Sequence, residues 1–107
     1  MKRGSVVTVA MPGSYGKPRP AVVIQSDLFS DLGSVVVLPI TSHLMNAPLV
    51  RINVKATSST GLDKHSQVMI DKPHTVPQAK IGSLIGHLDD STMLEINRSL
   101  MVVLGIA

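Results

Sequence analysis

Short runs of valine, isoleucine and leucine, separated by glycine, proline and polar residues, recur along most of this chain. Runs of this length and composition, bounded by turn residues, are typical of β-strands. The pattern predicts six strands: Ser5–Ala10, Pro20–Gln25, Ser34–Ile40, Leu49–Val54, Ser66–Asp71 and Ala79–Leu88. The last run holds Gly82 and Gly86, and two glycines in so short a stretch disfavour a helix there.

The polarity within each run predicts where its strand lies. Pro20–Gln25 is apolar almost throughout, so we expect it to be covered on both faces. Leu49–Val54 alternates between apolar and polar residues, which predicts a strand with one face in water. Pro39 lies near the end of its run and predicts an edge strand or a bulge. The polar stretches Ser26–Gly33 and Lys55–Lys64 are expected to be a turn and a loop.

The last segment changes to a helical period. Asp89, Asp90 and Ser91 offer side-chain oxygens that suit a helix N-terminus, and Gly105 suits its end. Apolar residues then recur at helical spacing: Met93, Ile96, Leu100, Val103 and Leu104. The sequence therefore predicts a mainly β fold, a strongly bent sheet or small barrel with a C-terminal α-helix over an open side. No linker or repeat divides the chain, so residues 1–107 are expected to form one domain.

The amino-acid composition limits the kinds of ligand and partner that the chain is expected to bind. Tyr15 and Phe29 are the only aromatic residues, which disfavours RNA binding by stacked aromatic platforms. Ten basic against seven acidic side chains give a net charge of +3, which favours a polyanionic partner. The absence of cysteine excludes thiolate metal sites and fits a cytoplasmic location. No apolar run reaches the ~20 residues of a membrane helix. The four histidines lack the spacing of a zinc site, so neither a metal nor a cofactor is expected.

A cationic, proline-stiffened segment precedes the second strand. It reads Gly16-Lys17-Pro18-Arg19-Pro20, and its two prolines restrict the backbone on both sides of the arginine. An arginine held in this way loses less conformational freedom when it binds an anion, and its planar guanidinium suits phosphate. The segment taken alone is better explained as a surface turn before a strand.

Five blocks in a fixed order give the clearest indication of function: KRGSVVTVAMPG, GKPRPAVVIQSD, VVVLPITS, SQVMIDK and IGSLIGHLDDSTMLEINRSLMVVLGI. Their order and spacing, over nearly the whole chain, resemble the MazF/PemK family of toxin ribonucleases. The resemblance implies an SH3-like barrel with a C-terminal helix, a homodimer, and sequence-selective cleavage of single-stranded RNA (mRNA). It also implies a cognate antitoxin whose acidic tail blocks the RNA groove, with operator DNA reached only through that antitoxin.

The same resemblance assigns roles to a few residues. Arg19 matches the family's catalytic arginine, and Thr41 matches its catalytic threonine. Ser42 falls where the family often has a small polar residue near the scissile phosphate. Met69 stands where some PemK members carry a second catalytic arginine, two positions before the aspartate matched by Asp71. A mechanism that depends on that arginine–aspartate pair is therefore not expected here.

Metal-independent RNA cleavage uses the neighbouring 2′-hydroxyl as nucleophile, so the site must position the ribose and neutralise charge on the phosphate. Arg19 suits the second task, and Thr41 can donate a hydrogen bond to the phosphate or hold the 2′-hydroxyl. Lys17, His43 and His74, the last expected on a loop, are predicted to contact substrate together with Ser42. Each of these is also explained as a solvated surface side chain, and the sequence identifies no general base.

Two other classes of protein fit the predicted fold. One is a CcdB-like gyrase poison, but such proteins end in Trp-Gly-Ile, whereas this chain ends in Leu-Gly-Ile-Ala. The other is a non-catalytic SH3-like binding module, against which the joint presence of Arg19 and Thr41 argues. If the chain cleaves RNA, the loops Pro12–Pro18 and Lys55–Lys64 are expected to determine which sequence it cuts.

Overall fold

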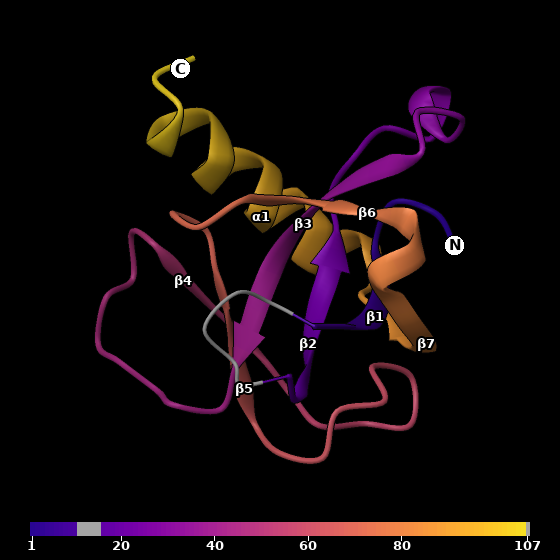
Figure 1. Cartoon of the computed structure of the whole chain (residues 1–107). Coiled ribbons are helices and arrows are strands. Elements are labelled where there is room, and N and C mark those ends of the chain that lie inside the picture. The colour runs from indigo at the N-terminus through magenta and orange to yellow at the C-terminus, as the bar shows by residue number, and fades with distance from the viewer. Residues whose placement is uncertain (11–15, 107) are drawn as a thin grey trace.

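The structure is a computed structural model that describes residues 1–10 and 16–106. These residues contain seven strands and one long helix. The strands are β1 (Ser5–Ala10), β2 (Pro18–Val23), β3 (Ser34–Thr41), β4 (Arg51–Val54), β5 (Ser66–Met69), β6 (His74–Pro77) and β7 (Ile81–His87). Two short 3-10 helices, η1 (Asp27–Phe29) and η2 (Gln78–Lys80), lie between strands, and α1 (Asp90–Val103) follows the last one (Figure 1).

The sheet is antiparallel, with the strand order β4-β5-β3-β2-β1-β7 and with β6 also paired to β3. β3 is thus central and changes its neighbour along its length. Ser34–Val37 pair with β6, whereas Ile40 and Thr41 pair with β5. On this side of β3, Pro39 lies between the ladder with β6 and the ladder with β5. Its missing amide donor therefore removes no hydrogen bond from either ladder. Of the two predictions made for Pro39, an edge strand or a bulge, the edge strand is wrong, because β3 has neighbouring strands on both sides.

Alternate residues of the central strands enter two separate hydrophobic clusters. The larger cluster lies under the helix and comprises Val6, Val22, Leu38, Ile40, Ile52, Val54, Leu62, Val68, Ile70, Leu88, Met93, Ile96 and Leu100. The smaller one lies on the other face and comprises Val7, Val9, Ala21, Val23, Val35, Val37 and Val76. β2 contributes to both clusters, which confirms the prediction that its apolar run is covered on both faces. β4 buries Ile52 and Val54 and exposes Asn53, as its alternation predicted.

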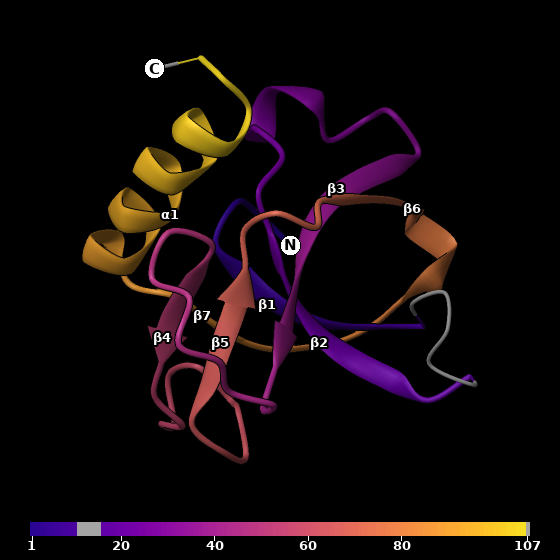
Figure 2. The ribbon, with the colours of Figure 1, turned by 90° about the vertical axis from the view of Figure 1, so that its left-hand side faces the viewer.

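The helix α1 begins as predicted. The Asp89 carboxylate accepts a hydrogen bond of 2.8 Å from the Thr92 amide, which caps the first turn. Met93, Ile96 and Leu100 are buried against the sheet, on the side of β4 (Figure 2). The predicted apolar stripe is longer than the part of the helix that is buried. Its last residue, Leu104, is 57% exposed.

The two end strands of the sheet, β4 and β7, do not pair with each other in the described part of the chain. The loop between β4 and β5 fills this opening instead. The His87 amide donates a hydrogen bond of 2.9 Å to the Ser59 carbonyl. A Cβ added at Gly61, whose φ is +71°, would lie 1.9 Å from the Ile85 carbonyl oxygen, so only glycine permits this approach. The fold is mainly β with a C-terminal helix, as predicted, and a loop contact completes its wall.

Two differences from the sequence prediction bear on the position of candidate site residues. β6 was not predicted, because it is four residues long, ends in a proline and buries only Val76. Its four residues pair with β3, with His74 opposite Val37. β2 begins at Pro18 instead of Pro20, so Arg19 belongs to the strand and lies opposite Val9 of β1. The predicted first loop, Pro12–Pro18, lies mostly outside the described residues.

Candidate active site

A groove of about 780 Å³ opens beside the carboxyl end of β3. Its walls come from the start of β2, the end of β3, the loop before β5 and the turn between β5 and β6. The lining residues are Arg19, Pro20, Pro39, Ile40, Thr41, Ser42, His43, Leu62, Asp63, Lys64, Ser66, Met69, Lys72 and His74. Five of the six predicted site residues thus share one groove. Lys17 is exposed just before β2 and is not among the lining residues.

Arg19 and Thr41 enter this groove from adjacent strands. Ala21 of β2 pairs with Pro39 of β3, and their ladder ends there, two residues short of Arg19 on one strand and of Thr41 on the other. Residues two apart on a strand point to the same face, so Arg19 shares the face of Ala21 and Thr41 that of Pro39. The two residues therefore form one end of the groove, at the exposed margin of the smaller cluster's face.

The Thr41 hydroxyl has a defined orientation. Its Oγ1 accepts a hydrogen bond of 3.0 Å from the His43 amide, which leaves the hydroxyl hydrogen free to donate into the groove. Thr41 itself is half-buried, whereas Ser42 and His43 are exposed in the turn that follows β3. The backbone of this turn therefore fixes where the hydroxyl points.

Gln67, which the sequence analysis did not single out, lies opposite Thr41 on β5 and is only 6% exposed. Its Oε1 accepts hydrogen bonds of 3.0 Å from the Met45 amide and from Arg51 Nη1. Its Nε2 donates bonds of 3.0 Å to the Met45 carbonyl and to Asn53 Oδ1. All four hydrogen-bonding positions of the carboxamide are thus used. The one indication of Gln67 in the sequence was a polar residue directly before the apolar run 68–70 of a predicted strand.

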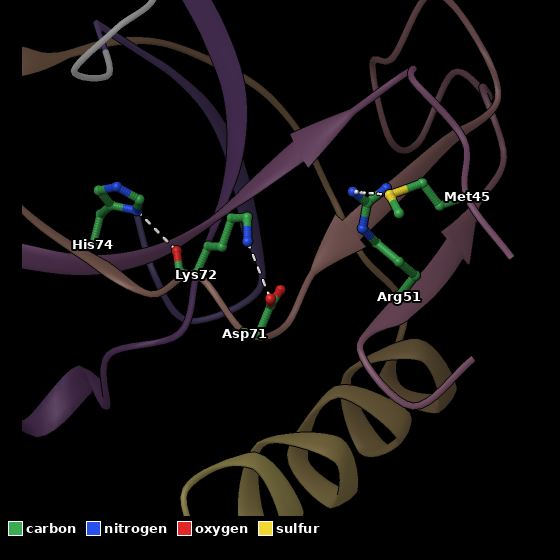
Figure 3. A network of polar contacts seen from close by, with 5 residues as sticks. All are labelled: Met45, Arg51, Asp71, Lys72 and His74. Atoms are coloured by element: carbon green, nitrogen blue, oxygen red, sulfur yellow. Dashed lines mark hydrogen bonds and ion pairs between the residues drawn. The ribbon is translucent and has the colours of Figure 1, made fainter. Parts of the chain in front are cut away.

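Arg51 of β4 extends this network to the same turn. In addition to Gln67, its Nη1 contacts the His43 carbonyl at 3.1 Å, and its Nη2 lies 3.2 Å from Met45 Sδ (Figure 3). The side chain therefore holds the turn after β3 at two points, His43 and Met45.

His74, Lys72 and Asp71 form a second polar group (Figure 3), of which His74 and Lys72 line the groove. Lys72 Nζ lies 3.1 Å from Asp71 Oδ2, and this contact is the main reason that the pKa of Asp71 is lowered. His74 Nδ1 lies 2.8 Å from the Lys72 carbonyl. Because a carbonyl only accepts, Nδ1 carries the proton and Nε2 is left for a ligand.

The expectation that His74 lies on a loop is wrong, since it begins β6 and pairs with Val37. Val37 and Thr41 are four residues apart on β3, which corresponds to about 13 Å along the strand. Thr41 and His74 thus mark two separate parts of one elongated groove.

The charges on the groove favour an anion. Arg19, Lys64 and Lys72 are cationic lining residues, against the single carboxylate of Asp63. Among the described residues, no three histidine, aspartate or glutamate side chains are grouped to hold a metal ion. Within the same residues, the one long helix is too short and too polar to cross a membrane.

Comparison with known proteins agrees with the fold and the groove. A family model described as "PemK-like, MazF-like toxin of type II toxin-antitoxin system" matches residues 2–104. The chain is 44% identical over 108 residues to "Probable endoribonuclease MazF" of Mycolicibacterium smegmatis, a match that covers 100% of this chain and 99% of that protein. This chain belongs to the PemK-like, MazF-like toxin family of type II toxin–antitoxin systems, as its motifs indicated.

Solved structures show the same fold at lower sequence identity. A mycobacterial endoribonuclease, solved in complex with its cognate antitoxin, superposes with a TM-score of 0.84 at 21% identity, covering 100% of this chain and 97% of that one. MazF from Deinococcus radiodurans gives a TM-score of 0.81 at 18% identity, covering 98% of this chain and 96% of that one.

Proposed function

We propose that this protein is a toxin endoribonuclease that cleaves single-stranded mRNA at short specific sequences, and thereby inhibits translation and growth. The observation that supports this most directly is that Arg19 of β2 and Thr41 of β3 bring a guanidinium and a hydroxyl to the lining of one cationic groove. The 44%-identical relative carries the name of the same activity. The proposed site of action is the cytoplasm, where mRNA is translated.

The proposed reaction is an internal transesterification that needs no metal ion. The 2′-oxygen attacks phosphorus, the bond from phosphorus to the 5′-oxygen breaks, and the products are a 2′,3′-cyclic phosphate and a 5′-hydroxyl. The 2′-hydroxyl loses its proton and the leaving 5′-oxygen gains one, so no water is consumed. In this reaction, Arg19 and Thr41 are the catalytic residues.

Arg19 stabilises the charge that gathers on the non-bridging oxygens, because its planar fork matches two phosphate oxygens at once. Thr41 donates its hydroxyl hydrogen to the phosphate or holds the 2′-hydroxyl, since its oxygen already accepts the His43 amide. Ser42, His43 and His74 bind neighbouring nucleotides along the groove. Lys17, outside the lining, contributes long-range attraction to the RNA backbone.

A cognate antitoxin and a second copy of the chain are the proposed protein partners. A cationic groove suits an acidic antitoxin segment, which would exclude RNA by occupying the same charges. A homodimer would cover apolar side chains that stay exposed on α1 and after it, among them Val102, Leu104 and Ile106. A CcdB-like gyrase poison is the alternative, and the match of the PemK-like model over residues 2–104 favours the ribonuclease.

The deciding experiment incubates the purified protein with a long unstructured RNA in EDTA and sequences the fragment ends. We expect cuts at a short recurrent sequence, with 2′,3′-cyclic phosphate ends. Arg19→Ala should lower kcat about 10²- to 10³-fold, the usual effect of removing one transition-state donor. Arg19→Lys retains the charge without the planar fork, so it should recover only part of this loss.

Lys80→Ala serves as the control, because Lys80 is an exposed cation on η2 away from the groove. Its cleavage rate should match that of the wild type. Intact RNA with the wild-type protein, or equal rates for wild type and Arg19→Ala, would refute the assignment.

A further inference from the structure

We infer that Gln67 is a positioning residue: its buried carboxamide clamps the turn after β3 and thereby aims the Thr41 hydroxyl at the scissile phosphate. This inference rests on the proposed function and adds to it a residue that does not touch RNA. Gln67 is 6% exposed and is not a lining residue of the groove, so its effect on the reaction must pass through other residues.

The clamp has the geometry of a peptide group. Gln67 accepts from the Met45 amide and donates to the Met45 carbonyl, both at 3.0 Å. A neighbouring strand would satisfy the same two backbone groups in this way. Met45 lies beyond the end of β3, where the chain has left the sheet. The side chain thus replaces a strand partner for a segment that has none.

The clamp acts on Thr41 through a short series of contacts. The two bonds to Met45 fix the far end of the turn, and Arg51, itself bound to Gln67 Oε1, holds the His43 carbonyl. The His43 amide in turn donates to Thr41 Oγ1 and sets the direction of the hydroxyl. A displacement of about 1 Å in a reacting group costs up to 10²-fold in rate, so release of this turn should be visible in catalysis.

The remaining two hydrogen bonds hold Gln67 itself. Arg51 donates to its Oε1, and Asn53 accepts from its Nε2, and both residues lie on the adjacent strand β4. Because β4 packs against α1, the turn is anchored to the body of the protein.

The first experiment replaces Gln67 with leucine, which has a similar volume and no polar group. Under single-turnover conditions, Gln67→Leu should lower the cleavage rate about 10- to 100-fold and leave RNA affinity within about twofold. Amide hydrogen exchange at His43 and Met45 should become at least about tenfold faster, while exchange in β1 and β2 stays unchanged. A merely structural role would weaken protection throughout the sheet.

Two further variants test the clamp if leucine is not tolerated. Arg51→Ala removes the contacts to Gln67 and to the His43 carbonyl from a half-buried position, and should also accelerate exchange at His43. Asn53→Ala is the matched control, because it removes one bond to Gln67 from an exposed side chain and leaves both Met45 bonds intact. It should keep the cleavage rate within about threefold.

The outcomes separate this inference from the proposed function. RNA left intact by the wild-type protein refutes the function, whereas the exchange measurement needs no RNA and still tests the clamp. Unchanged exchange at Met45 in Gln67→Leu, together with unchanged exchange at His43 in Arg51→Ala, overturns the clamp. Faster exchange with an unchanged cleavage rate overturns its role in positioning Thr41.

Discussion

Arg19 of β2 and Thr41 of β3 line one groove from adjacent strands, each two residues beyond the last pair of their ladder, Ala21 with Pro39. Both residues lie within strands, and sites built on strands keep their geometry better than sites built on loops. The sheet therefore brings the backbones of the two residues to one groove, and the turn after β3 fixes the direction of the Thr41 hydroxyl.

The Thr41 hydroxyl should be separable from the shape of its side chain. Thr41→Val keeps the shape and removes the donor, so we expect kcat to fall about 10²- to 10³-fold. Thr41→Ser keeps the hydroxyl and should remain within about tenfold of the wild type. Single-turnover cleavage of a defined oligonucleotide measures both rates, and equal rates for the two variants would contradict the role of the hydroxyl.

The groove lysines should contact the RNA backbone. Affinity for an uncleavable single-stranded RNA should fall with salt at a log–log slope of about −0.7 per phosphate contacted. Lys64→Ala and Lys72→Ala should each make the slope shallower by about 0.7, and Lys80→Ala should leave it unchanged. Fluorescence anisotropy over a salt series gives these slopes. A complex insensitive to salt would indicate a protein target instead of RNA.

Gly61 should be far less replaceable than Gly33, although both have positive φ values, +71° and +76°. Nothing lies within 4 Å of a Cβ added at Gly33, so Gly33→Ala should cost only the backbone strain, roughly 1–2 kcal/mol. Gly61→Ala adds a clash with the Ile85 carbonyl, and the total should reach about 2–5 kcal/mol. Urea unfolding measures the difference, and equal costs would show that the loop does not contact β7.

The cap of α1 should make stability depend on pH. Hydrogen bonds donated by the side chain and the amide of Thr92 lower the pKa of Asp89. A lowered pKa in the folded state means that the carboxylate stabilises the fold above its ordinary pKa, and that this contribution is lost as pH falls through the folded value. Asp89→Asn keeps a capping side chain that does not titrate.

Urea unfolding of the wild type and of Asp89→Asn between pH 7 and pH 3 tests this. The wild type should be the more stable at neutral pH, and its advantage should begin to shrink as the pH falls below about 4, the ordinary pKa of an aspartate. A difference that stays constant over this range would exclude titration of the cap.

The sequence predicted the elements whose patterns are local. The closing helix and the alternating strand β4 follow from periodicity, which depends only on neighbouring residues. β6 escaped prediction because its existence depends on β3, a partner distant in the chain, and because only Val76 of its four residues is buried. The prediction of an edge strand at Pro39 was wrong because it too depended on distant strands. No local pattern shows that β3 changes its neighbour from β6 to β5.

The residues of the candidate site likewise divide into those that the sequence predicted and those that it did not. Arg19 and Thr41 were predicted from motifs, and both line one groove of the structure. Gln67 was missed because its importance lies in four hydrogen bonds to residues on other segments, which no spacing in the sequence reveals. Burial of a polar side chain becomes informative only when its partners are known.

The way Gln67 holds the turn after β3 bears on how such a protein can change its target. The bonds to Met45 reach only main-chain atoms, so they are indifferent to which side chains the turn carries. Ser42 and His43 can therefore be exchanged for other residues without loss of the loop's shape. If these side chains bind nucleotides as proposed, point mutations in the turn can change which nucleotides are preferred and leave Arg19 and Thr41 in place.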